Sequence, residues 1–301
     1  VFASFYPEDP DDFDLLKVAL GKLKLSDPAL VFEPETKEAL GRGFRCGFLG
    51  TLHVEIVSER LEREFGLGLV ISTPSVIYKI FNNQGKEEII YSASDWPDPT
   101  FIAESTEPWV LMELMAPASY LGKLMDVMRE VRGNYLKTDY ISGQRAVISY
   151  EAPLRAIVAR LYDRVKSISQ VYASMSYQPI GYRPAQLVKL EIFIAGKKED
   201  AFSRVVEEHD AYEEGKKLVE KLKDNLPPQQ FSVALQAVVG GKVIARETIS
   251  ARRKDVTGYL YGGDVTRKKK LLEKQKKGKK LLKEKANVQV PPKTFLEIFR
   301  S

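Results

Sequence analysis

Cysteine and histidine are scarce in this chain, and their scarcity excludes several kinds of site. The 301 residues include one cysteine, Cys46, and two histidines, His53 and His209, far apart in the sequence. A single cysteine cannot form an intramolecular disulfide, which fits a reducing compartment. A zinc cluster of Cys and His ligands cannot be assembled from this set, so we predict no metal site. We expect Cys46 to be a buried apolar residue, His53 to be structural and His209 to lie on the surface.

Long apolar runs and nucleotide-binding motifs are also lacking. No stretch approaches the roughly 18 to 20 apolar residues of a membrane-spanning helix, and no signal peptide is recognisable. Neither the phosphate-loop pattern GxxxxGK(S/T) nor the NKxD pattern occurs. Residues 255–258 fit DxxG, but so short a pattern occurs by chance. We therefore predict no catalytic residue here. Because Val1 already lies in an expected strand, we also expect a truncated or processed N-terminus.

Positive charge is concentrated near the end of the chain. The net charge is +5, but residues 252–285 carry 14 Lys and Arg against 4 Asp and Glu, a local +10. The rest of the chain carries 32 basic and 37 acidic residues, or −5. An acidic body with a basic tail indicates a polyanionic partner.

The basic stretch has few apolar residues to anchor it. Between residues 267 and 285 these are Leu271, Leu272, Leu281 and Leu282, and Gly278 costs roughly 1 kcal/mol of helix propensity. Like charges one turn apart weaken a helix further. We expect a helix that is marginal alone and is ordered by phosphates. RNA is the favoured partner, and an anionic membrane surface is the alternative. We predict RNA contacts from Arg252, Arg253, Lys254, Arg267, Lys268, Lys269, Lys270, Lys274, Lys276, Lys277, Lys279 and Lys280.

Two further groups could contact RNA. Tyr259 and Tyr261 interrupt the basic stretch, and they could stack on bases or close a small core. The glycine-rich segment 41–50 is most simply a strand with tight turns that enters a helix. Within it, Arg42 and Arg45 could contact RNA or a neighbouring domain.

The order of expected elements predicts an α+β fold with an internal repeat. Apolar spacing gives β-α-β-β-α-β over residues 1–76, which is a ferredoxin-like split βαβ unit. A hairpin and linker follow over 77–104. The same order recurs over 105–186, with its first strand expected at 109–115. Residues 187–301 form a third, α+β domain with a helix expected at 207–222, a Gly240-Gly241 turn and the basic helix.

Two segments resemble one known family. Residues 43–69, GFRCGFLGTLHVEIVSERLEREFGLGL, resemble the third domain of the LepA (elongation factor 4) family of translational GTPases. Residues 236–280 resemble the C-terminal domain specific to that family. The resemblance implies an elongation factor G-like domain III at 1–76, a domain V at 105–186 and a LepA-specific domain at 187–301. Elongation factor G itself places a large fourth domain between domains III and V, where this chain has only about 30 residues.

What the resemblance implies about function concerns the whole parent protein. Such factors are GTPases associated with back-translocation of tRNAs, and their partners are ribosomal RNA and an A-site tRNA. GTP and magnesium would bind a domain absent here, so we expect no cofactor and no enzymatic activity in this fragment. The resemblance also implies a monomeric cytoplasmic protein, with peripheral association at the inner face of the cell membrane, or an organellar location in a eukaryote. The alternative is a generic RNA-binding or membrane-surface module.

Overall fold

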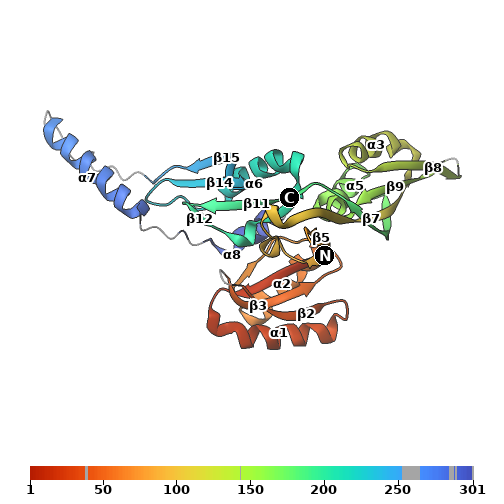
Figure 1. Ribbon diagram of the computed structural model, residues 1–301, viewed down its shortest axis with the longest axis horizontal. Coiled ribbons are helices and arrows are strands. Elements are labelled where there is room, and N and C mark those ends of the chain that lie inside the picture. Colours follow the sequence, from red (N-terminus) through yellow and green to blue (C-terminus); the bar gives the residue numbers. More distant parts are fainter. Residues whose placement is uncertain (38–39, 143, 253–264, 285–287, 289, 300–301) are drawn as a thin grey trace.

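Three sheets and their helices make an elongated molecule from which one helix projects (Figure 1). This computed structural model describes all residues except 38–39, 143, 253–264, 285–287, 289 and 300–301. Each sheet is antiparallel and carries helices, so the predicted α+β class is confirmed. Among the described residues, no helix is both long and apolar enough to cross a membrane.

The first sheet has the ferredoxin-like topology that the sequence predicts. Its strands lie in the order β2-β3-β1-β4, all antiparallel. Asp9 accepts a hydrogen bond from the backbone N–H of Asp11 in the turn that leads into α1. Gly66 ends α2 in the left-handed conformation, with φ of 69°. The elements are β1 Phe2–Pro7, α1 Phe13–Ser26, β2 Val31–Lys37, β3 Gly41–Gly47, α2 Thr51–Phe65 and β4 Leu69–Ile71.

The second sheet repeats this topology and adds a hairpin. The order β10-β7-β9-β8 matches that of the first sheet. The hairpin β5–β6 pairs with the N-terminal end of β7. The elements are β5 Tyr78–Asn82, β6 Glu87–Ile90, β7 Ile102–Pro117, α3 Leu121–Glu130, β8 Asn134–Ser142, β9 Arg145–Pro153, α4 Leu154–Ala156, a π-helical turn Ile157–Leu161, α5 Tyr162–Ile168 and β10 Ser174–Pro184.

Two expected element boundaries are wrong for the same physical reason. The strand expected at 109–115 begins at Ile102, because β5 pairs with residues 102–106 of β7. The helix expected at 207–222 begins at Ala211, because Arg204–Glu207 form β13, which pairs with β11. In both places pairing with a distant strand decides the local conformation.

The C-terminal domain has a sheet covered by α6, and then the projecting helix. The strand order is β12-β11-β14-β15, with β13 also paired to β11. Gly240 and Gly241 both have positive φ, as a two-residue hairpin turn requires. The elements are β11 Leu187–Ile194, β12 Lys197–Lys198, β13 Arg204–Glu207, α6 Ala211–Asn225, β14 Val233–Val239, β15 Lys242–Ile249, α7 Val265–Glu284 and α8 Pro292–Phe299.

The first and C-terminal domains share one hydrophobic core. Helix α8 packs against both α6 and β4. Within it, Phe295 stacks on Phe202, with ring centroids 4.8 Å apart. The backbone N–H and the hydroxyl of Thr73 both donate to the carbonyl of Ala201, at 2.9 and 3.1 Å. The second domain has a core of its own, and a smaller apolar cluster around β5 and β13 joins it to the C-terminal domain.

Candidate nucleic-acid interface

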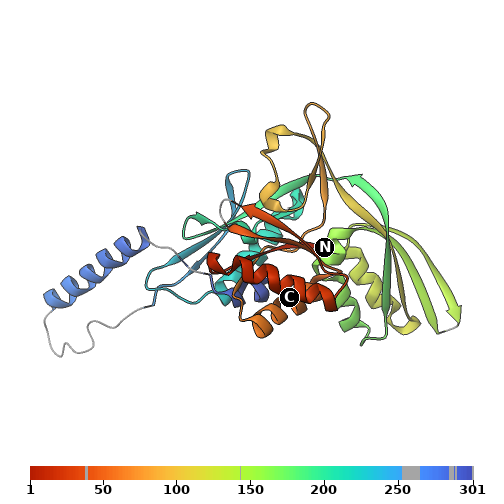
Figure 2. The same cartoon turned by 90° about the horizontal axis from the view of Figure 1, so that it is seen from below.

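Helix α7 is the most prominent surface feature of the molecule. It projects away from the three sheets at one end of the long axis (Figures 1 and 2). Along residues 265–278 every side chain is exposed or half-buried. The predicted basic helix therefore exists, and its cations lie where a large polyanion could reach them.

The cations of α7 occupy both sides of the helix. Arg267, Lys270, Lys274 and Lys277 follow one another at spacings of three and four residues, which places them along one stripe. Lys268, Lys269 and Lys276 lie on the opposite side by the same register. A phosphate backbone could therefore approach either side.

Some predicted RNA-contacting residues lie outside the described part. Arg253, Lys254, Tyr259 and Tyr261 are among the residues that the structure does not describe. Positions 279 and 280 belong to α7, but the described part does not extend to the side chains of Lys279 and Lys280. Arg252 is exposed just after β15, and its backbone N–H donates to the carbonyl of Gln229 at 2.7 Å. RNA contacts by all of these residues stay predictions.

Arg42 and Arg45 both make contacts within the protein. The guanidinium of Arg42 lies 3.9 Å from the ring centroid of Phe13. Arg45 pairs with Glu33 at 2.7 Å and lies 4.0 Å from the ring of Tyr91, beyond the first domain. Arg45 thus joins the first domain to the segment that follows β6, and an RNA contact by either arginine stays a prediction.

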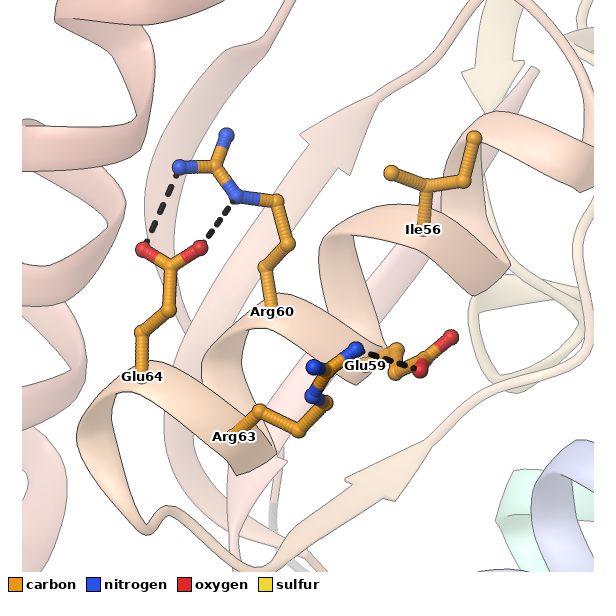
Figure 3. A pocket seen from close by; sticks show the side chains of 5 residues that line it. All are labelled: Ile56, Glu59, Arg60, Arg63 and Glu64. Atoms are coloured by element: carbon orange, nitrogen blue, oxygen red, sulfur yellow. Dashed lines mark hydrogen bonds and ion pairs between the residues drawn. The ribbon is translucent and has the colours of Figure 1, made fainter.

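A small hollow on α2 is lined by charged side chains, and each positive charge there is paired with a negative one. Figure 3 shows its lining, in which Arg60 pairs with Glu64 at 2.6 Å and Arg63 with Glu59 at 3.2 Å. The hydrogen bond from Arg60 lowers the pKa of the Glu64 carboxyl. Each pair joins two residues one turn apart on the same helix, so its two charges cancel. Such pairs stabilise α2 only slightly.

The two histidines and the cysteine have structural surroundings. His53 Nδ1 accepts from the backbone N–H of Leu49 at 3.1 Å, and its Nε2 lies 2.6 Å from Asp27. His209 is exposed, as expected. Cys46 is fully buried, and burial raises the pKa of its thiol. Its expected role as an apolar residue is confirmed.

One cluster that resembles a metal site is already occupied by an arginine. One ligand atom from each of Glu207, His209 and Asp210 lies within 4.8 Å of the others. The guanidinium of Arg132 contacts His209 Nδ1 and pairs with Asp210 at 3.0 Å. Arg132 thus supplies the positive charge that a metal ion would bring. No sequence pattern points to this cluster, because Arg132 and His209 are 77 positions apart.

Two protein-family models match adjacent parts of the chain. Residues 194–300 match the family model of the GTP-binding protein LepA C-terminus. Residues 104–193 match that of the elongation factor G C-terminus. The second match covers the repeated ferredoxin-like unit, and the first covers most of the domain that carries α7.

Curated relatives match the chain from end to end. Elongation factor 4 of Bacteroides fragilis is 48% identical over 300 residues, covering 100% of this chain and 51% of the relative. Elongation factor 4 of Thermus thermophilus is 50% identical, covering 99% of this chain and 49% of the relative. For that of Leptospira biflexa the identity is 48%, with 100% and 50% covered. The chain thus spans about half the length of these relatives. It belongs to the LepA (elongation factor 4) family of translation factors and corresponds to the C-terminal part of its members.

Proposed function

We propose that this chain is the ribosome- and tRNA-binding portion of a LepA-type translation factor, with α7 as the element that contacts RNA. The observation that supports this is the exposure of α7, with cations on both sides of a projecting helix. A 20-residue helix is about 30 Å long, which spans several phosphates of an RNA strand. Phosphate contacts would give affinity and orientation rather than sequence choice.

The rest of the proposal concerns the parent protein. The parent is a cytoplasmic GTPase associated with back-translocation of tRNAs, and this portion contacts ribosomal RNA and the A-site tRNA. GTP and magnesium bind elsewhere in the parent, and this portion is a monomer without catalytic activity. The two ferredoxin-like units act as spacers between α7 and the remainder of the factor.

Peripheral binding to an anionic membrane is the second candidate, but the arrangement of α7 favours RNA. A helix that lies in a membrane interface needs one apolar face. Over residues 265–278 the large apolar side chains of α7 are Val265, Leu271 and Leu272. Leu271 and Leu272 point about 100° apart because they are consecutive in a helix. Val265 and Leu272 share one side, but Lys269 and Lys276 lie on that side too, so the described part of α7 has no continuous apolar face.

Ribosome co-sedimentation across a range of salt concentrations tests the proposal. We expect the affinity to fall by about 10³-fold or more between about 50 and 200 mM salt if six or more phosphates are bound. Free tRNA should displace the chain from ribosomes more effectively than anionic vesicles do. Binding that survives high salt unchanged, or vesicles that compete better than tRNA, would refute the RNA mechanism. The isolated chain should not hydrolyse GTP, and turnover would contradict the absence of catalysis.

A further inference from the structure

The C-terminal domain is joined to its two neighbours in different ways. Its contact with the first domain is an apolar core that includes the Phe202–Phe295 stack. Its contact with the second domain combines a smaller apolar cluster, to which Leu187 and Val205 belong and against which Leu154 and Val158 pack, with a cleft of about 950 Å³. One wall of this cleft comes from α3 and the helical segment 154–168, and the other from β13 and α6. Residues 73–78, between β4 and β5, also line it. An apolar core resists separation, so a movement between the second and C-terminal domains would pivot on the smaller apolar cluster, and the cleft beside it leaves room for that movement.

Ion pairs from two arginines cross this cleft. Arg132, just after α3, pairs with Asp210 at 3.0 Å and lies 3.6 Å from Glu207. Arg155 pairs with Glu207 at 3.2 Å and with Glu107 of its own domain at 3.0 Å. Glu207 is therefore shared by both arginines, and the two arginines act at the same point of the C-terminal domain.

The two arginines differ in how easily their pairs can open. The side chain of Arg155 is 21% exposed and that of Glu107 only 3%. Burial disfavours the charge on Arg155, but attraction to Glu107 outweighs it and raises the pKa of the guanidinium. The side chains of Arg132 and Asp210 are 47% and 33% exposed. Water and salt therefore compete with the Arg132 pair much more than with the buried one.

The backbone crosses between the two domains in a short connection. Strand β10 leads into β11 through Ala185 and Gln186. The backbone N–H of Ala185 donates to the carbonyl of Ser105 in β7, and the carbonyl of Gln186 accepts from the backbone N–H of Glu208, both at 2.9 Å. The crossing is therefore only two residues long, and Ala185 packs against the smaller apolar cluster.

We propose that Arg132 is a releasable latch between the second and C-terminal domains. With its ion pairs formed, the cleft is held closed. When they break, the domains rotate about the smaller apolar cluster, the Arg155–Glu107–Glu207 contact and the crossing at Ala185 and Gln186. The C-terminal domain carries α7, so the latch sets the direction of α7 relative to the second domain. Arg132 is thus a positioning residue and does not itself contact RNA.

Distances between paired nitroxide labels test this directly. Lys123→Cys on α3 and Lys216→Cys on α6 place exposed labels on the two sides of the cleft. Cys46 is buried and will not be labelled in the folded protein. The matched control is Arg129→Ala, because Arg129 pairs with Asp126 of the same helix at 3.1 Å.

We expect a narrow distance distribution in the otherwise unmodified chain and in the Arg129→Ala variant. Arg132→Ala should broaden it and shift it to longer distances. Adding Asp210→Ala to Arg132→Ala should broaden it no further, because both changes break the same ion pair. A distribution that Arg132→Ala leaves unchanged would overturn the latch.

A salt titration gives a second test without a substitution in the latch. Raising the salt from about 0.05 to 0.5 M shortens the screening length from about 14 to about 4 Å. The doubly labelled chain with Arg132 intact should then broaden toward the distribution of the Arg132→Ala variant. The variant itself should change little. A salt-independent distribution would also overturn the latch. Neither test involves RNA, so a failure of the latch is distinguishable from a failure of the proposed function.

Discussion

The sharpest test of α7 compares its two sides with equal changes in charge. One variant reverses Lys270, Lys274 and Lys277 to Glu, which lie on the stripe with Arg267. The other reverses Lys268, Lys269 and Lys276 on the opposite side. Both variants change the net charge equally, and Glu has nearly the helix propensity of Lys, so α7 should persist. The new Glu side chains relieve repulsion among the Lys and Arg side chains of α7. This gain should offset the repulsion between Glu side chains that lie one turn apart.

The expected effect follows from how many phosphates each variant can no longer bind. Each variant loses three cations, so we expect both to bind more weakly than the unmodified chain, and the weaker binder of the two identifies the side of α7 that faces the RNA. If three phosphates are no longer neutralised, the slope of log affinity against log salt becomes shallower by about 2 to 3. The ratio of the affinity of the unmodified chain to that of the variant should then fall by about 20- to 40-fold between about 50 and 200 mM salt.

Ribosome co-sedimentation at several salt concentrations measures both slopes. A control that reverses Lys17, Lys86 and Lys123, exposed lysines in three other parts of the chain, changes the net charge equally. The control should bind with nearly the slope of the unmodified chain, because it retains α7. If both α7 variants also keep that slope, α7 does not contact RNA. If the control reduces the slope as much as they do, binding depends on overall charge, and the argument from α7 fails.

Three further predictions concern the second and first domains. Gly133→Ala should destabilise the second domain by about 1–3 kcal/mol in thermal melts, because the new Cβ would clash with the carbonyl oxygen of Glu151. Gly122→Ala is its control and should raise the stability of exposed α3 by up to about 1 kcal/mol, since nothing lies within 4 Å of its Cβ. Tyr150→Phe should cost about 1–3 kcal/mol in urea unfolding, because the proton of the buried hydroxyl is shared among the carbonyl oxygens of Met128, Val131 and Gly133, which lie 3.0 to 3.1 Å from it. A neutral result would mean that water satisfies those carbonyls. The Cys46 thiol should stay unreactive toward a thiol reagent until the chain unfolds, because it is buried and burial raises its pKa. Rapid modification of the folded chain would show that the first sheet opens.

Local signals in the sequence were sufficient for much of the fold. Asp9 and Gly66 mark helix ends through their own side chain or backbone freedom, so they are readable one residue at a time. Repetition of the β-α-β-β-α-β order predicted two ferredoxin-like sheets, and the strand orders confirm them. The basic helix was expected from residue 267 and is observed as Val265–Glu284. Charge density and the few leucines were enough to place it.

Contacts between distant segments were beyond such reasoning. The N-terminal end of β7 and all of β13 are strands only because other strands pair with them. The latch brings Arg132 to a cluster whose histidine is 77 positions away, and no pattern in either segment points to the other. The shared core of the first and C-terminal domains was also missed, because the short apolar segment at 294–299 gives no hint of what it packs against. An interface between domains forms between the surfaces of folded domains. The sequence of one surface does not show which other surface it will contact.

The way α7 is attached decides which part of the molecule it can move. The strand before it, β15, belongs to the sheet of the C-terminal domain, and the helix after it, α8, lies in the core shared with the first domain. Both anchors of α7 therefore belong to one joined body. A pull on α7 by a bound RNA would act on that body as a whole. The second domain would follow through the β10–β11 connection, the smaller apolar cluster, the buried Arg155 contact and the latch at Arg132. Releasing Arg132 should thus allow α7 and the second domain to reach two sites whose separation the closed form does not match.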